Sequence, residues 1–502
     1  MRRAPLRPGG AWLAALVLPL LVTPTWAWTL DVKETTLSNG MEVMVVERDH
    51  VPLVACHLWV DAGAANEDLG ATGIAHFHEH LMFKGTPKIG TSDYDAETGL
   101  MERQDELAEQ INAELDRGDA ADMERVAELR AELMALEDQQ RDHVIPSHLD
   151  RLYSEAGASG LNAGTSYDYT MYTVTVPANK VELWMWLESD RFAGPVFREF
   201  YSERQVIGEE RKQVLEDEPT GPYHELLDMV TFPESTYGQE IVGTMKDIGM
   251  LTRPEAYAFF GDYYVPNNMA LVLVGDVDAD EVFEMAETYF GRIPASDEPD
   301  PNRTRERHNV GERRVRVEAQ AQPQVDIRYI TTTFGSEDDA VLDVIAGILS
   351  GESGRLYKRL VLEEQIALAV DASSYTRKVS GSFDLSAVPA EPGGHAQVEA
   401  ALTDELERLA TEPVSDSELE KVKKQARADL MRAVRANDFL ALMMGYYWVQ
   451  TGDWRGLLDT VDEIAAVTAD DVMEVADKYF DRDNRAVGWL VAEGVEDEEA
   501  EE

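Results

Sequence analysis

Residues 251–275, LTRPEAYAFFGDYYVPNNMALVLVG, return in related form at residues 467–494, VTADDVMEVADKYFDRDNRAVGWLVAEG. Thr252, Tyr263 and Asn268 of the first copy have identical residues 216 positions later. Each copy has the pattern of an amphipathic helix, a short turn and an apolar strand. The repeat therefore predicts an α+β protein with two homologous domains, each built from a sheet and packed helices.

The rest of the chain divides around this repeat. A polar segment with prolines separates the two copies and predicts a linker. Before the first copy, apolar stretches predict strands at residues 36–47, 51–61 and 169–176. We therefore expect a signal peptide at residues 1–27, an N-terminal domain at 28–294, a linker at 295–312, a C-terminal domain at 313–493 and an acidic tail at 494–502.

A segment rich in Glu, Ala, Leu and Arg interrupts the first predicted domain at about residues 91–152. Apolar residues recur at near-helical spacing on both sides of residues 116–119, DRGD, and this pattern predicts a helical hairpin insertion. The hairpin could be a surface embellishment of the N-terminal domain. The alternative is a lid or a partner contact near the functional site.

The sequence GIAHFHEHLMFKGT, residues 73–86, predicts a metal site on a helix. His76 and His80 are four residues apart and lie above one another on an α-helix, so their neutral imidazoles can share one Zn²⁺ ion. Glu79 projects into the same sector and is suited to take a proton from a zinc-bound water. His78 projects to the opposite face and is expected to be a packed or surface residue. The order H-x-x-E-H is the inverted counterpart of the H-E-x-x-H zinc motif.

A third metal ligand is expected from ERQVIGEERKQV, residues 203–214. A helical projection places Glu203 and Glu210 inside a stripe of aliphatic residues, and buried carboxylates need a partner. Glu209 projects away from the stripe and is expected to be a solvated charge. We therefore predict that Glu210 is the third ligand and that Glu203 holds a ligand histidine by its other ring nitrogen.

Four ordered segments resemble the pitrilysin/insulinase family of zinc metallopeptidases, and the similarity covers essentially the whole chain after the first thirty residues. The resemblance is to the short two-domain type, similar to the subunits of mitochondrial processing peptidase. It implies antiparallel or mixed sheets with helices packed on one face, twice. The four segments are residues 73–86, LNAGTSYDYTMYTVTVP at 161–177, ERQVIGEE at 203–210 and YGQEIVGTMKDI at 237–248.

The resemblance implies roles for the residues that match the family's motifs. His76, His80 and Glu210 are expected to bind one zinc ion per chain, and Glu79 is expected to be the general base. The family therefore implies a zinc-dependent hydrolase of peptide bonds.

The same resemblance implies a substrate-binding strand. Asn162 and Ala163 are expected to lie along the bound peptide, and Phe83 is expected to line a subsite. From the residues alone, Asn162 fits an ordinary turn residue. The second domain lacks H-x-x-E-H and is expected to be catalytically empty. It has Leu368 or Ala369 where the family often has a substrate-holding tyrosine, and this departure weighs against a direct substrate role.

The N-terminus predicts export to the periplasm or the exterior. Three arginines, an apolar run at about residues 11–22 and a small-residue site ending at Ala27 fit a cleaved signal peptide. The alternative is an uncleaved anchor, although the run is short for a membrane span. The chain has one cysteine, Cys56, so an internal disulfide is excluded despite the export signal.

The charge of the chain constrains its partners. The formal net charge is −51, from 96 acidic and 45 basic residues. Nucleic acid and anionic membrane surfaces are poor partners for such a field, whereas basic peptides are attracted to it. Because the acidic residues are spread throughout the chain, the charge indicates solubility in a saline environment more than it indicates substrate choice.

These observations predict an exported zinc endopeptidase that acts on peptides or unfolded segments. The alternatives are a non-catalytic assembly or chaperone-like subunit of a peptidase complex and a hydrolase of another amide. Long members of the family enclose their substrate between two halves, each made of a pair of related domains. The single pair predicted here therefore implies a homodimer, or a heterodimer with a related chain that lacks the zinc motif.

Overall fold

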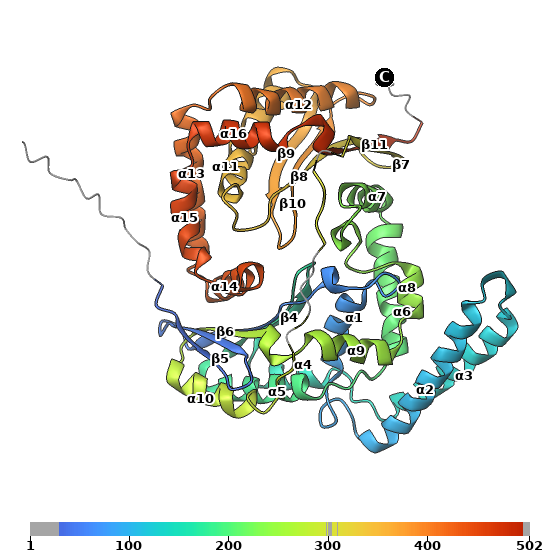
Figure 1. The fold of residues 1–502 in the computed structure, drawn as a ribbon. Helices are drawn as coiled ribbons and strands as arrows, with labels where there is room; N and C mark the ends of the chain where they lie inside the picture. Colours follow the sequence, from blue (N-terminus) through green and yellow to red (C-terminus); the bar gives the residue numbers. More distant parts are fainter. Residues whose placement is uncertain (1–29, 298, 300–303, 309, 495–502) are drawn as a thin grey trace, which may run out of the picture.

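The computed structural model describes residues 30–494 except 298, 300–303 and 309. Two mixed sheets, each packed with helices, form two halves of the molecule (Figure 1). This arrangement confirms the predicted α+β class. The expected signal peptide at 1–27 and all but the first residue of the expected tail lie outside the described residues.

The first sheet has six strands in the order β1-β2-β6-β3-β5-β4. Strands β2 and β6 pair in parallel, and the other neighbours are antiparallel. Strand β6 is buried along its whole length, whereas β4 lies at an edge. The strands are β1 Lys33–Thr36, β2 Glu42–Glu47, β3 Leu53–Val60, β4 Ser159–Thr165, β5 Thr170–Pro177 and β6 Met269–Gly275.

The single strand predicted at residues 36–47 is wrong, because the chain makes a hairpin there. Strand β1 ends at Thr36, β2 begins at Glu42, and the two pair antiparallel. The Leu37 N–H donates to the Met41 carbonyl oxygen at 2.8 Å, and Gly40 has a φ of 93°. The dipeptide Asn-Gly favours this kind of turn between strands, and it was the signal for the break.

The core of the first half lies between one face of its sheet and the helices that cover it. Side chains from β2, β3 and β5 meet those of α1, α5, α9 and α10 there. The helices of this half are α1 Ile74–Leu81, α5 Val181–Ala193, α6 Phe200–Arg211, α7 Gly221–Thr231, α8 Met245–Met250, α9 Arg253–Tyr263 and α10 Ala279–Tyr289.

The second sheet has five strands in the order β7-β11-β8-β10-β9, with β7 and β11 parallel. Its strands are β7 Arg313–Ala319, β8 Gln324–Thr331, β9 Ala367–Tyr375, β10 Gly381–Pro389 and β11 Arg485–Ala492. The helices of this half are α11 Asp339–Leu349, α12 His395–Thr411, α13 Asp416–Ala433, α14 Asn437–Thr451, α15 Gly456–Ala466 and α16 Ala469–Tyr479.

The internal repeat has the same structure in both halves. Thr252 and Thr468 each cap a helix through a capping box, at the start of α9 and of α16. Asn268 and Asn484 follow these helices, and each donates from Nδ2 to the carbonyl oxygen of its repeat tyrosine at 2.9 Å. Asn268 also donates to the carbonyl oxygen of Asp61, directly after β3, and Asn484 donates to that of Ile330, near the end of β8. Strands β3 and β8 are the antiparallel neighbours of β6 and β11. The matching residues therefore fix the same helix-to-strand junction twice.

The helical hairpin insertion is formed by α2 Tyr94–Leu115 and α3 Met123–Arg141. It projects from the first half as a separate arm in Figure 1 and leads into α4 His148–Glu155. A bridge between Thr91 and Val144 joins the two ends of the arm. None of the described helices combines the length and apolar character that crossing a membrane requires.

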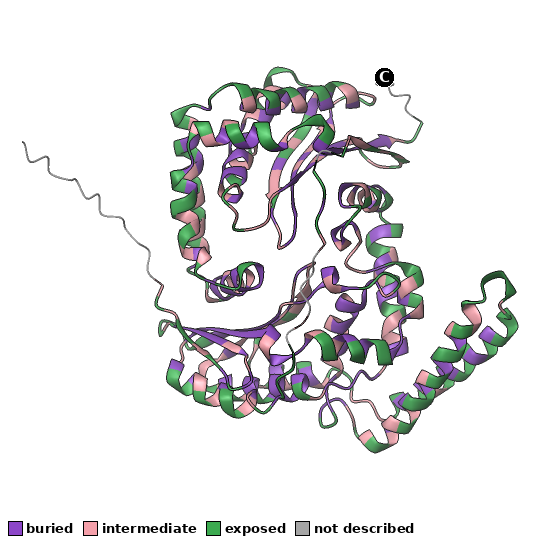
Figure 2. Cartoon of the chain, in the orientation of Figure 1, coloured by how far each residue is buried: buried purple, intermediate pink, exposed green. Residues whose placement is uncertain are grey.

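The two halves share an apolar interface. Helix α14 of the second half packs on the face of the first sheet that its own helices leave uncovered. Residues of α14 and of the first sheet are coloured as buried in Figure 2. Trp59 on β3 is fully buried against α14, where Met444 and Trp448 join the same cluster. A Cβ atom at Gly445 would lie 2.1 Å from the Trp59 indole, so this approach requires glycine.

Gly445→Ala should therefore lower the free energy of unfolding by about 2 kcal/mol, because overpacking a rigid buried ring typically costs 1–3 kcal/mol. Gly261→Ala is the matched control, since Gly261 lies in helix α9 with nothing within 4 Å of its added Cβ. Its free energy of unfolding should rise by up to about 1 kcal/mol through helix propensity alone. Urea unfolding of both variants measures the difference, and two changes of the same sign would contradict the packing argument.

Candidate metal centre

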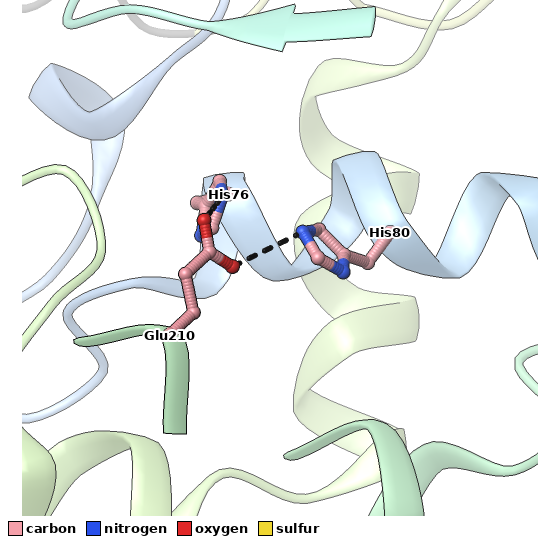
Figure 3. Close-up of side chains that lie close together, drawn as sticks. All are labelled: His76, His80 and Glu210. Carbon is pink, nitrogen blue, oxygen red and sulfur yellow. Dashed lines mark ion pairs between the residues drawn. The ribbon is translucent and has the colours of Figure 1, made fainter. Parts of the chain in front are cut away.

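Three side chains converge in the first half of the molecule. His76 and His80 come from α1, Glu210 comes from α6, and one nitrogen or oxygen of each lies within 4.8 Å of the others. Figure 3 shows the carboxylate of Glu210 directed at both imidazoles. The Nε2 atoms of His76 and His80 lie 3.7 and 3.6 Å from the two Glu210 oxygens. The structure thus brings together the three residues predicted as metal ligands.

The start of α1 is fixed by a carboxylate that the sequence reasoning missed. Glu67 is 8% exposed and accepts hydrogen bonds at 2.8 Å from the backbone N–H groups of Gly73 and Ala75. These N–H groups are unpaired within the helix, so Glu67 supplies their hydrogen-bond partners. Gly73 has a φ of 89°, and a Cβ there would lie 2.5 Å from the Val242 carbonyl oxygen.

Helix α6 brings Glu210 to the site by packing against α1. The rings of Phe77 and Phe200 lie 4.6 Å apart between the two helices, and Ile207 is buried beside them. The apolar stripe predicted around Glu210 is only partly correct, because Val206 and Val214 are 51% and 59% exposed. Val214 lies in the π-helical turn Lys212–Glu216 that follows α6, where a regular helical projection does not apply, whereas Val206 lies within α6 on a side left exposed.

Glu209 lies on the outside of α6, as the projection predicted. It is exposed and forms an ion pair with Lys212 at 2.6 Å. His78 is fully buried among aromatic rings and lies 5.0 Å from the ring of Phe197, so it belongs to the core. Both residues are turned away from the three converging side chains.

Glu203 orients His80. Its Oε1 atom lies 3.0 Å from His80 Nδ1, and its Oε2 atom lies 2.5 Å from Lys84 Nζ. Burial alone would raise the pKa of Glu203, but the bonds to His80 and Lys84 outweigh it and lower the pKa to about 2. The ionised carboxylate accepts a hydrogen bond from the Nδ1–H group of His80, so the Nε2 atom carries the lone pair and faces Glu210.

His76 is held by burial. Its side chain is 14% exposed, and burial followed by the nearby His80 lowers its pKa to about 4. Burial also lowers the pKa of His80, but its carboxylate neighbours, with Glu203 foremost, raise it above the usual value. His76 is therefore a neutral imidazole at neutral pH, which is the form that binds a metal.

Glu79 lies beside the three converging residues and is bonded to a strand. The Thr165 hydroxyl of β4 donates to Glu79 Oε2 at 2.8 Å. Burial raises the pKa of the Glu79 carboxyl, and a raised pKa makes a carboxylate a better proton acceptor near neutral pH. Glu79 thus has the environment of a general base next to a place where a metal could bind.

The donor set fits Zn²⁺. Bonds of about 2.1 Å in tetrahedral geometry separate neighbouring ligand atoms by about 3.4 Å, and the observed separations of 3.6 and 3.7 Å are close to that value. Two imidazoles and one carboxylate form a ligand set of catalytic zinc sites, in which the fourth position is left for water or substrate. Glu79 and Glu203 add negative charge around a bound cation.

Glu203→Gln should weaken zinc affinity by about ten- to hundredfold, the usual effect of removing a partner that orients a ligand histidine. The amide cannot accept the Nδ1 proton with the strength of a carboxylate, so the His80 ring loses its fixed orientation. Competition with a chromophoric chelator measures the affinity. Glu209→Gln, on the exposed side of the same helix, is the matched control; equal affinities in the two variants would contradict the role of Glu203.

The residues expected to contact substrate lie next to this centre. Phe83, Asn162 and Ala163 line a cavity of 480 Å³ that also reaches Glu79 and His80. Asn162 and Ala163 belong to β4, the edge strand of the first sheet. The alternative interpretation of Asn162 as a turn residue is therefore wrong, because Asn162 lies within β4 and pairs with Thr173 of β5.

The second half has no comparable site in the part of the chain that the structure describes. Leu368, at one of the two positions matched to the family tyrosine, lies on the edge strand β9 and is 59% exposed. Arg355, an arginine of the second half that lies in the sequence before the position of the family tyrosine, forms an ion pair with Glu418 at 2.7 Å within the same half.

Three residues of the site were missed by the sequence reasoning, namely Glu67, Lys84 and Thr165. Lys84 and Thr165 lie inside segments already recognised, GIAHFHEHLMFKGT and LNAGTSYDYTMYTVTVP. Glu67 could have been found as an acidic residue shortly before a helix that lacks a capping side chain at Gly73.

Two protein families match consecutive parts of the chain. Residues 43–119 and 132–245 match the family described as Insulinase (Peptidase family M16). Residues 250–426 match the family described as Peptidase M16 inactive domain. The two matches together cover most of the chain, and the candidate metal centre lies wholly in the first.

Curated relatives are similar over nearly the full length. Zinc protease PqqE of Helicobacter pylori is 25% identical over 462 residues, which cover 89% of this chain and 90% of that protein. The uncharacterized zinc protease YmxG of Bacillus subtilis is 23% identical, with coverage of 90% and 96%.

Solved structures share the fold. A protease from Helicobacter pylori superposes with a TM-score of 0.76 at 23% identity and covers 92% of this chain and 100% of that chain. The periplasmic protease PqqL from Escherichia coli gives a TM-score of 0.69 at 18% identity and covers 93% of this chain but 48% of PqqL. The two family matches follow one another along the sequence, and the solved structures share the fold. This chain therefore belongs to the insulinase family of peptidases, peptidase family M16.

Proposed function

We propose that this protein is an exported zinc-dependent endopeptidase that hydrolyses peptides or unfolded polypeptide segments. The observation that carries the proposal is the convergence of His76, His80 and Glu210, with Glu79 beside them on the same helix. The zinc proteases among its relatives support the same chemistry.

Each residue of the site has a separate role in the proposed hydrolysis. His76, His80 and Glu210 would hold one Zn²⁺ ion, which supplies a Lewis acid and lowers the pKa of a water to about 7. Glu79 accepts a proton from the attacking water and then donates it to the leaving amine. Thr165 holds the Glu79 carboxylate by its hydrogen bond, and Glu203 keeps His80 in the required orientation.

The substrate is proposed to bind as an added strand. Strand β4 lies at the edge of the first sheet, so its outer backbone groups can pair with an extended peptide. Asn162 and Ala163 would lie along the peptide and Phe83 would line a subsite. Main-chain pairing of this kind requires an extended or unfolded segment, which favours peptides over folded proteins.

From the sequence we also propose that the protein is exported and that it divides into two domains joined by a linker. The N-terminal pattern of residues 1–27 supports a cleaved signal peptide, and the structural neighbour PqqL is a periplasmic protease. We place the catalytic domain at 28–294, the linker at 295–312 and the non-catalytic domain at 313–493. The boundaries are supported by the gap between α10, which ends at Tyr289, and β7, which begins at Arg313.

The active particle is proposed to contain two chains. The chain has one pair of related units, and PqqL is about twice as long as the part that this chain covers. A second polypeptide would cover the site and exclude water during the reaction. It could be a second copy or a related chain without the zinc motif.

Light scattering combined with a peptidase assay tests this assembly. The purified chain should be dimeric, or monomeric and inactive until a related chain is added. A monomer with full activity at nanomolar concentration would contradict the two-chain proposal.

The alternative is a non-catalytic assembly subunit. Such a subunit would have no need for three converging candidate ligands, a carboxylate bonded to His80 and a half-buried Glu79, all of which lie together in this chain. A panel of fluorogenic peptides and other amides, with and without a chelator, distinguishes the two functions. Peptide cleavage that stops with chelator and returns with zinc is expected; binding of peptides without any zinc-dependent cleavage would support the alternative.

A further inference from the structure

The cavity beside Glu79 is lined in part by the segment that follows the helical arm. Its volume of 480 Å³ is within the usual range for ligand pockets, roughly 300–1,000 Å³. Glu79 and Phe83 line the cavity, and residues 144–150, where the chain returns from α3, form another part of its wall. The backbone N–H of Gly90 donates to His148 Nδ1 at 3.0 Å. The wall is therefore tied to the segment that follows the metal helix.

The position of the cavity along β4 indicates which substrate residue it receives. Thr165, at the end of β4, bonds to Glu79, whereas residues 161–163, nearer its beginning, line the cavity. A peptide that pairs antiparallel with this edge strand runs from Thr165 towards Ser159. The part of the peptide that reaches the cavity then lies after the part beside Glu79. The cavity therefore receives a side chain on the carboxyl side of the scissile bond.

Two carboxylates face this cavity in addition to those of the candidate metal centre, and they belong to Glu199 and Asp150. Lys84 Nζ lies 2.5 Å from Glu203 but 3.6 Å from Glu199 Oε2. Glu203 also bonds to His80 and is thus fully occupied. Among the described residues, the longer contact with Lys84 is the one ion pair of Glu199, so its carboxylate has capacity for a closer cation.

The backbone fixes where the Glu199 side chain begins, at the N-terminus of α6 beside the cavity. Glu199 precedes the first residue of α6 and has a φ of 56°, in the left-handed region that is unfavourable for a residue with a Cβ. Its carbonyl oxygen accepts the Glu203 N–H at 2.8 Å, and its side chain is 25% exposed. The carboxylate is thereby partly shielded from solvent, where an ion pair is stronger than on an open surface.

We propose that this cavity selects arginine or lysine at the position after the scissile bond, by an ion pair with Glu199 and with support from the more exposed Asp150. The proposal rests on the proposed peptidase function. A long cationic side chain can lay its aliphatic stem along Phe83, Ile145 and Leu161 while its charged end reaches Glu199. The net charge of −51 adds a long-range attraction for such peptides.

The test compares two quenched fluorescent peptides that differ only after the scissile bond, one with arginine and one with citrulline. Citrulline has the same shape without the charge, so the ratio of kcat/KM isolates the ion pair. The wild type should prefer arginine by about tenfold, which corresponds to about 1.4 kcal/mol. Glu199→Gln keeps the side-chain length and should remove most of this preference. Asp150→Asn should reduce the ratio less, and its effect should shrink in high salt.

Because both peptides share the same metal centre, any loss of zinc in a variant cancels in the ratio, and metal analysis of each variant reports it separately. Glu209→Gln, an exposed carboxylate of α6 that does not line the cavity, should keep the full preference. Equal cleavage of the two peptides by the wild type would overturn the proposal and leave the peptidase function standing. Survival of the preference in Glu199→Gln, or product masses that place arginine before the cleaved bond, would overturn it equally. Absence of any zinc-dependent cleavage would instead contradict the proposed function itself.

Discussion

Glu79→Gln should reduce kcat for peptide hydrolysis by about a thousandfold, within the 10²- to 10⁴-fold range of general acid–base catalysis. The carboxamide has the shape of the carboxylate but cannot accept the proton of the attacking water. Its oxygen can still accept the hydrogen bond of the Thr165 hydroxyl, so the fold and the position of the side chain should be preserved. Rates at saturating substrate, together with zinc analysis, measure the effect.

The zinc content separates this role from a structural one. Glu79→Gln should bind about one zinc per chain, because the three converging residues are untouched. Thr165→Val is the matched comparison, since it removes the hydroxyl that holds Glu79 but leaves the carboxylate, and its loss of kcat should be much smaller. A Glu79→Gln protein that keeps more than a tenth of wild-type kcat, or that loses its zinc, would show that Glu79 is not the base.

Glu210→Gln should weaken zinc binding by more than about a hundredfold, and activity should fall with it. Removing an outer partner of a ligand already costs about ten- to hundredfold in affinity, and the loss of a charged ligand costs more. The Glu210 oxygens are 3.6 and 3.7 Å from the two imidazoles, so no other part of α6 can replace them at that position. Equilibrium dialysis against buffered zinc measures the affinity.

Glu209→Gln is the control for this variant as well. The neighbouring carboxylate has the same charge and the same helix, but it is exposed and paired with Lys212. It should retain zinc and full activity. The opposite pattern, with zinc lost in Glu209→Gln and kept in Glu210→Gln, would mean that α6 presents a different face to α1.

Much of this site could be predicted, because the spacing of residues along an α-helix fixes which side chains share one face. The spacing of His76 and His80 fixes their shared face on any α-helix, and the structure places both beside Glu210. The 216-residue repeat likewise predicted two units with the same helix-to-strand junction, because Asn268 and Asn484 each bond to the end of a partner strand.

Other features depend on contacts that periodicity does not report. Val214 lies in the π-helical turn after α6, and Val206 is exposed because no neighbouring element covers that side of α6. The capping of α1 by Glu67 depends on a loop that turns back on the helix. The acidic cavity behind the helical arm requires the arm to return to β4, and no local pattern specifies that path.

The most direct test of the account is the position of the metal. Crystals soaked with zinc, with anomalous diffraction recorded on both sides of the zinc absorption edge, should show one strong peak in the first half of each chain. We expect this peak about 2.1 Å from nitrogens of His76 and His80 and from an oxygen of Glu210, with Glu79 outside bonding distance. A peak coordinated by other residues, or density in which Glu79 replaces Glu210 as a ligand, would contradict the account.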